Sequence, residues 1–141
     1  MVPGGGGGGS CSSNSNSNGS AGGGMLCMFS KDIDLTGITI NLNANITTAN
    51  NETSGGTGSG GSCLIKCVNA TLGTNKITAT SPQPPSTTWS GGRGATGSVG
   101  RINVDYSGSI TGTTNPTLSS RLDSTIKAGG GAQPTYYTEF I

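Results

Sequence analysis

Hydrophobic residues in this chain occur in short runs between glycine-rich stretches, and their spacing predicts β-strands. The clearest pattern covers residues 38–47, where apolar and polar residues alternate for ten positions. Alternation with a period of two places apolar side chains on one face of a strand, so this set is expected to face a core. The set is Ile38, Ile40, Leu42, Ala44 and Ile46. Residues 25–30 are almost continuously apolar, which predicts a strand buried on both faces, and residues 31–34 are predicted to turn.

A weak threefold repeat places these runs at a regular spacing of about 38 residues. Residues 24–29 return as residues 62–67 and again as residues 100–105. Equivalent positions in stacked repeats lie above one another, so we expect Leu26, Leu64 and Ile102 to form one column. No segment has the 3.6-residue period of a helix.

The repeat predicts an all-β fold. Each unit reads as a strand, a turn, a second strand and a glycine loop, and the second unit has its turn at residues 73–75. The simplest stack of about three such units is a right-handed parallel β-helix or a related solenoid. Frequent turn signals leave an antiparallel β-sandwich or jelly roll as the alternative.

The chain length fits one domain with three parts. Residues 1–24 are rich in Gly, Ser and Asn, and predict either a flexible linker or packed glycine strands in polyproline II conformation. Residues 25–118 are the predicted repeat domain. Residues 119–141 form a C-terminal segment whose last residues, 135–141, are β-prone and are a candidate inter-subunit strand. The candidate assembly residues there are Tyr136, Tyr137, Phe140 and Ile141.

Composition limits both the core and the partners. Only 30% of the residues are hydrophobic and 4% aromatic, so the core must be thin and backbone pairing must supply much of the stability. Charged residues are 9% of the chain, the net charge is +1, and the basic residues are scattered, which argues against a nucleic-acid partner. The sequence has no apolar run of about 18 residues, so we expect no membrane-spanning helix.

The residues needed for catalysis are sparse. The chain has no histidine, which rules out a Ser-His-Asp or Cys-His site, and its six acidic residues are dispersed. We therefore expect a non-catalytic protein with no metal and no cofactor. Trp89, in a loop rich in Pro, Ser and Gly, is the best candidate for contact with a ligand such as a host-surface glycan. Four sequons give glycosylation candidates, which are Asn18, Asn45, Asn51 and Asn69.

The four cysteines are Cys11, Cys27, Cys63 and Cys67. Cys63 and Cys67 lie about 13 Å apart on an extended strand, which is too far for a mutual disulfide. One interpretation is a disulfide from Cys63 or Cys67 to Cys27 or to Cys11. The simpler interpretation is that the cysteines are small apolar strand residues.

The glycine loops that lead into residues 62–80, followed by residues 97–106 and 112–116, resemble glycine-rich repeats of phage tail-fibre and adhesin-like proteins and of large bacterial surface proteins. The resemblance implies a non-catalytic module on an extracellular or virion surface. The N-terminus lacks the features of a secretory signal, which favours a phage protein or a piece of a longer one. We expect a structural subunit of a fibre or appendage that assembles with itself through β-strands. The alternative is a receptor- or glycan-binding adhesin module that uses Trp89.

Overall fold

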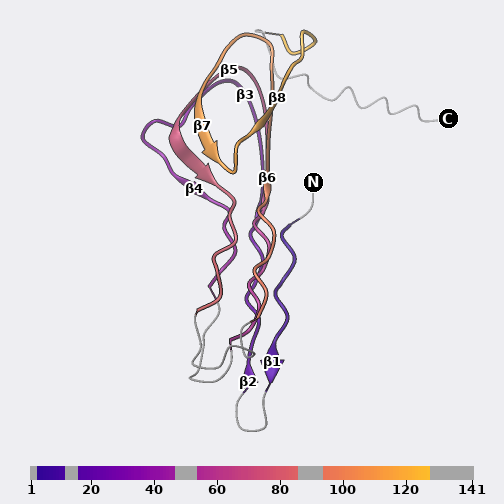
Figure 1. Ribbon diagram of the computed structural model, residues 1–141. Coiled ribbons are helices and arrows are strands. Elements are labelled where there is room, and N and C mark those ends of the chain that lie inside the picture. The colour runs from indigo at the N-terminus through magenta and orange to yellow at the C-terminus, as the bar shows by residue number, and fades with distance from the viewer. Residues whose placement is uncertain (1–2, 12–15, 47–53, 86–93, 128–141) are drawn as a thin grey trace, which may run out of the picture.

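The computed structural model describes residues 3–11, 16–46, 54–85 and 94–127, and over these residues the chain is all-β, without helices, as expected. Figure 1 shows an elongated molecule, in which a broad head holds β3 to β8 and a narrow stem of extended segments ends at β1 and β2. The strands are β1 (Ser10–Cys11), β2 (Asn16–Ser17), β3 (Met25–Asp34), β4 (Ile40–Asn41), β5 (Ser62–Thr78), β6 (Arg101–Tyr106), β7 (Ile110–Asn115) and β8 (Ser119–Leu122).

The head is a six-stranded sheet in which the strand pairs are parallel. Its order is β3-β5-β6-β8, and β4 and β7 also pair with β5. Met25 on β3 lies opposite Ser62 on β5, and Ser62 lies opposite Arg101 on β6. The first step covers 37 residues, as between Asp32 and Asn69, and the second covers 39 residues, as between Ser59 and Ser98. Their average is the spacing of the sequence repeat. Parallel pairing across this sheet differs from the antiparallel pairing that a sandwich requires.

The predicted column of Leu26, Leu64 and Ile102 is wrong by one residue. Leu26 lies opposite Cys63, and Cys63 lies opposite Ile102. Leu64 is the next residue along β5 and lies on the other face of the sheet. Because side chains alternate between faces, the register sets which residues are buried. The observed register buries Cys63 and leaves Leu64 half-buried.

The core runs through the head as two inward columns. Cys63 and Ile102 share one column, and Ile65 and Val104 share the next, with exposures between 0% and 2%. Complete burial of an aliphatic side chain of this size contributes roughly 1.5–3 kcal/mol. Tyr106, two residues after Val104 on β6, is half-buried and packs against this core.

β3 departs from its prediction in two ways. Met25 and Phe29 are 52% and 66% exposed, so the strand is not buried on both faces. Only its inward side chains pack on the core, because nothing described covers the outer face of β3. The strand also continues through the predicted turn at residues 31–34, where Asp32 lies opposite Asn69 and Asp34 lies opposite Thr71.

The alternating segment 38–47 is buried only in its middle. Leu42 and Ala44 are 8% and 7% exposed, whereas Ile38 and Ile46 are 55% and 64% exposed. Leu42 and Ala44 are held because their N–H groups donate to Thr78 O and Thr80 O, at 2.8 and 2.9 Å. Ile40 is half-buried and also packs against the core, as expected. Ile38 and Ile46, at the two ends of the pattern, lie outside the core, which sequence alternation alone does not predict.

The turn predicted at residues 73–75 is a bend inside β5. Gly73 has a φ of 66° and Asn75 a φ of 49°, both in the left-handed region that glycine and asparagine adopt most readily. Gly112, on β7, has a φ of 101° and lies against Gly73. The bend therefore repeats in the neighbouring strand, and β5 stays paired on both sides of it.

The stem consists of glycine-rich segments hydrogen-bonded side by side. Ser20 N and Gly23 N donate to Gly56 O and Ser59 O, at 3.1 and 2.8 Å. Three residues separate successive bonds, which is the period of polyproline II. A methyl group added to Gly22 would overlap the backbone of Gly4, so the segments approach more closely than other residues would allow. Residues 3–9 and 17–24 are thus paired parts of the stem.

Candidate assembly surface

The outer edge of β3 offers backbone hydrogen-bonding groups. Among the described residues β3 pairs with β5 alone. Gly24 O accepts from Ser62 N at 3.0 Å, and such groups alternate between the two sides of a strand. Met28 therefore directs its N–H and C=O toward β5, and Met25 and Phe29 direct theirs to the open side. Such an edge is a template on which another strand can pair.

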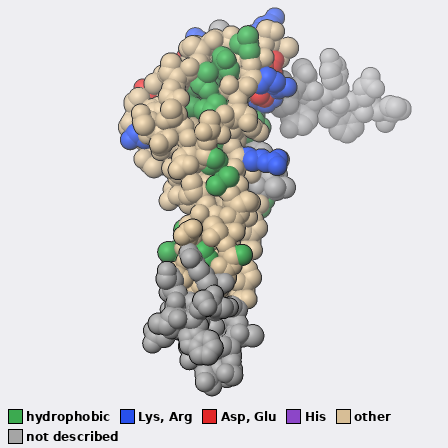
Figure 2. Space-filling view, in the orientation of Figure 1, with side chains coloured by type: hydrophobic (Ala, Val, Ile, Leu, Met, Phe, Trp, Pro, Cys, Tyr) green, Lys and Arg blue, Asp and Glu red, His purple; other side chains and the backbone are tan. Residues whose placement is uncertain are grey.

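Apolar side chains lie beside this edge. Met25 and Phe29 project from the outer face of β3, and Ile38, in the segment between β3 and β4, is 55% exposed. Figure 2 shows hydrophobic side chains gathered on the exposed surface of the head. A strand added to β3 would place its own side chains beside Met25 and Phe29 and cover part of their surface.

A charged ladder crosses the outer face toward the opposite end of the sheet. Phe29, Lys66, Asp105 and Arg121 lie opposite one another on β3, β5, β6 and β8. The Lys66 ammonium is 3.5 Å from the Asp105 carboxylate. Arg121 donates to both carboxylate oxygens of Asp105, from Nε at 3.1 Å and from Nη2 at 2.9 Å. These hydrogen bonds, and then the charge of Asp105, raise the pKa of Arg121.

The two ends of the sheet therefore differ in character. The β3 end carries exposed Met and Phe, whereas the β8 end carries Arg121 and Asp123, which lie 3.5 Å apart. Asp123 accepts from the hydroxyl and the N–H of Thr125, and these bonds lower its pKa. Leu122, on β8, is 64% exposed. Because one end is apolar and the other is charged, a contact between the two ends of neighbouring copies would join two different surfaces.

A polar bridge ties three layers of the head together. Asn69 Nδ2 donates to Asp32 Oδ1 at 2.8 Å, and Asn69 Oδ1 accepts from the N–H and the hydroxyl of Ser109, both at 3.1 Å. The sequence around Asn69 indicates only a sequon. Its role in bridging was missed because it depends on the strand register that places Asp32 opposite it.

Cys27, Cys63 and Cys67 carry thiols and form no disulfide with one another. Cys63 and Cys67 are buried, and both have raised pKa values, chiefly because burial disfavours the thiolate. For Cys63 the pKa rises to about 11. The side chain of Cys11, on β1, lies outside the described part of the chain. The three described thiols fit the interpretation of cysteine as a small strand residue.

Several candidate residues lie outside the described ranges. They are Trp89, Asn51 and the four C-terminal assembly residues Tyr136, Tyr137, Phe140 and Ile141. Asn18 and Asn45 are exposed in the stem, and Asn69 is engaged in its bridge. Lys66 and Arg121 are scattered cations in the sequence, but pairing of the strands brings both to Asp105. The signal available in the sequence was the repeat itself, since Lys66 and Asp105 occupy neighbouring units.

The described residues hold no group of three or more His, Cys, Asp or Glu side chains placed to bind a metal ion. Nor does this part of the chain contain a helix of the length and hydropathy needed to cross a membrane. Comparison with protein-family models, with curated proteins and with solved structures finds no match.

Proposed function

We propose that this chain is a non-catalytic structural subunit of an extracellular fibre or virion appendage, which assembles by adding strands to an open sheet edge. In this proposal the head is a short parallel β-helix of about three coils. The parallel pairing of β3 with β5 and of β5 with β6, at nearly equal separations along the chain, supports it, because each coil then lies directly on the one before.

The observation that carries the proposal is the outer edge of β3, along which no other described strand pairs. Proteins that work as monomers usually protect such edges with charge, proline, a bulge or a covering segment. Between Met25 and Ser30 the strand has no charged residue and no proline, and it holds exposed Met25 and Phe29. The charged residues of β3 all lie in its last four positions. Such an edge favours strand addition over protection.

The unlike ends of the sheet indicate the geometry of assembly. If the β3 edge pairs with the β7 and β8 side of the next copy, the contact joins two different surfaces. Heterologous contacts that do not close into a ring build an open filament. A fibre is therefore the form we propose, with each copy continuing the stack of the one before.

Two substitutions at Phe29 test strand addition. Both Phe29→Pro and Phe29→Ala remove the ring, but only proline also removes the N–H that faces the open edge. Proline is tolerated on an edge strand when its nitrogen faces away from the sheet, so both variants should fold. Light scattering and negative-stain microscopy across a concentration series should show assembly of wild type and Phe29→Ala, with a threshold concentration about tenfold higher for Phe29→Pro.

Amide exchange at β5 and β6 provides the control for folding. If both variants keep that protection and assemble equally well, edge pairing at β3 is not the mechanism. The adhesin alternative depends on Trp89, which lies outside the described residues, and it stays a prediction. The same is true of assembly through residues 135–141.

A further inference from the structure

One stem segment occupies a cradle formed by two others. Residues 3–9 lie along segments 17–24 and 54–61 and bond to both. The four hydrogen bonds are Gly4 N to Gly23 O (2.9 Å), Gly7 N to Ser20 O (2.7 Å), Ser59 N to Gly5 O (2.8 Å) and Gly56 N to Gly8 O (2.7 Å). The segment thus donates to one neighbour and accepts from the other, once every three residues.

The next two segments, 54–61 and 94–100, repeat the same construction. Thr57 N and Gly60 N donate to Ala95 O and Ser98 O, at 3.0 and 2.9 Å. The hydroxyls repeat as well. Ser20 Oγ accepts from Gly58 N at 2.9 Å, and Thr57 Oγ1 accepts from Gly97 N at 3.1 Å. A second cradle of the same type therefore lies beside the first, one layer along the stack.

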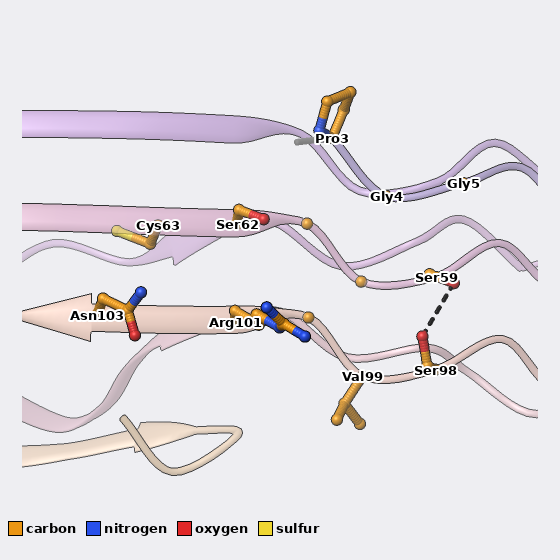
Figure 3. Close-up of a pocket in the computed structure, with 13 residues that line it drawn as sticks. Pro3, Gly4, Gly5, Ser59, Ser62, Cys63, Ser98, Val99, Arg101 and Asn103 are labelled. Carbon is orange, nitrogen blue, oxygen red and sulfur yellow. Dashed lines mark hydrogen bonds between the residues drawn. The ribbon is translucent and has the colours of Figure 1, made fainter. Parts of the chain in front are cut away.

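At its end nearest the head, where residues 59–61 and 98–100 line it, this second cradle opens into a groove of about 570 Å³. Figure 3 shows it between Pro3, Gly4 and Gly5 on one side and the successive layers that contain Ser59 and Ser98. The Ser98 hydroxyl donates to the Ser59 hydroxyl at 3.2 Å. Eight of the thirteen lining residues are glycine or serine, so backbone groups are accessible from the groove.

The register identifies the backbone groups that a ligand would meet. The step from Gly23 to Gly60 equals the step from β3 to β5, and the step from Ser59 to Ser98 equals the step from β5 to β6. Gly60 O and Ser98 N are thus the equivalents of Gly23 O and Ser59 N, which bind Gly4 N and Gly5 O. Within the described residues neither equivalent group forms a hydrogen bond.

We propose that this groove binds a glycine-rich strand, in polyproline II conformation, from a separate polypeptide. The segment in the first cradle specifies the chemistry. Methyl groups on Gly4 or Gly7 would overlap the backbones of Ser59 and Gly56, whereas methyl groups on Gly5 or Gly8 would meet nothing within 4 Å. The partner strand therefore needs the pattern Gly-x-x-Gly with its glycines facing the groove. The glycine segments described in this chain are already paired in the stem, which favours a different chain as the source.

Two peptides and two variants test the proposal on the full chain. The first peptide, Pro-Gly-Lys-Gly-Gly-Lys-Gly, keeps glycine at the inward positions, and the second, Pro-Ala-Lys-Gly-Ala-Lys-Gly, does not. Ser98→Pro removes the N–H that would donate to the peptide. Proline adopts the φ of polyproline II, so the substitution fits the backbone of this segment. Ser98→Ala is the matched control, because it loses the same hydroxyl and keeps the N–H.

Titration at millimolar peptide, followed by amide NMR shifts, should move the signals of Gly60, Ser98 and Gly100. The alanine peptide and the Ser98→Pro variant should each bind about tenfold more weakly, and Ser98→Ala within about twofold of wild type. Absent shifts, or equal binding by Ser98→Pro and Ser98→Ala, would overturn the proposal. So would a Ser98 amide protected from exchange in the isolated protein, because the groove would then be filled by this chain or by a second copy. Assembly at β3 does not enter this test.

Discussion

A single methyl group in the stem gives the sharpest test of its close backbone packing. At Gly7, an added Cβ would lie 2.7 Å from the carbonyl carbon of Thr57 and nearer still to the carbonyl oxygen of Gly56. At Gly8, the adjacent residue, an added Cβ would meet nothing within 4 Å. Gly7→Ala and Gly8→Ala therefore make the same chemical change in the same segment, one toward the neighbouring backbone and one toward solvent.

The expected loss of stability in Gly7→Ala follows from how far the two backbone segments must move apart. Ordinary contact begins near 3.4 Å, so the backbones at Gly7 and Thr57 must separate by about 0.7 Å or more. Overpacking of this kind costs about 1–3 kcal/mol. Detachment of residues 3–9 limits the loss, because it breaks four hydrogen bonds at about 1 kcal/mol each. We expect Gly7→Ala to lower the free energy of unfolding by about 1–4 kcal/mol, and Gly8→Ala to change it by under about 1 kcal/mol, since alanine also restricts the unfolded chain.

Urea unfolding followed by circular dichroism measures both values, and amide exchange at Gly4 and Gly7 reports local detachment. In Gly7→Ala the N–H of Gly4 should lose protection even if the head stays folded. Equal stability and equal protection in the two variants would refute the packing of residues 3–9 against residues 54–61.

Two further predictions concern the head. Burial raises the pKa of Cys63 to about 11 from an ordinary value of 9.0, so the stability that the neutral thiol confers is complete below pH 9 and is lost as the pH rises toward 11. Denaturant titrations from pH 8 to 11 should show a steeper fall for wild type than for Cys63→Ala, and parallel curves would contradict it. Asp105→Asn should weaken the contacts of Lys66 and Arg121, destabilise the protein by about 1 kcal/mol and remove protection at Asp123 N, which bonds to Tyr106 O. Asp34→Asn, which alters only an exposed contact with Thr36, should have little effect on stability. An equal loss of stability in Asp34→Asn and Asp105→Asn would show that the contacts of Asp105 with Lys66 and Arg121 contribute no more than an exposed contact.

The sequence predicts the period of the stack more reliably than its register. Gly/Ser stretches before each apolar run marked three passes of the chain, and β3, β5 and β6 lie at those runs. The step from β3 to β5 is one residue shorter than the average repeat and the step from β5 to β6 is one residue longer, so alignment at the average assigned Leu64 to the wrong face. A shift of one residue is invisible in a sequence with few large apolar residues, because Cys63 and Leu64 are both plausible core residues.

The surface was harder to predict because it depends on what lies next to each strand. Residues 25–30 have the composition of a buried strand, yet β3 ends the sheet and Phe29 is 66% exposed. The bridge of Asn69 and the pairing of Lys66 with Asp105 arise only when chain segments one repeat apart come into contact. No local pattern distinguishes such residues from solvated polar positions.

Backbone hydrogen bonds between successive passes of the chain hold this protein together. Long-range HNCO spectra, which detect coupling across a hydrogen bond, test these bonds directly. We predict correlations from Gly23 N to the Ser59 carbonyl and from Gly60 N to the Ser98 carbonyl, where the donor–acceptor distances are 2.8 and 2.9 Å. Amides at these positions that exchange at unprotected rates, or that couple to carbonyls nearby in the sequence, would contradict the parallel stack.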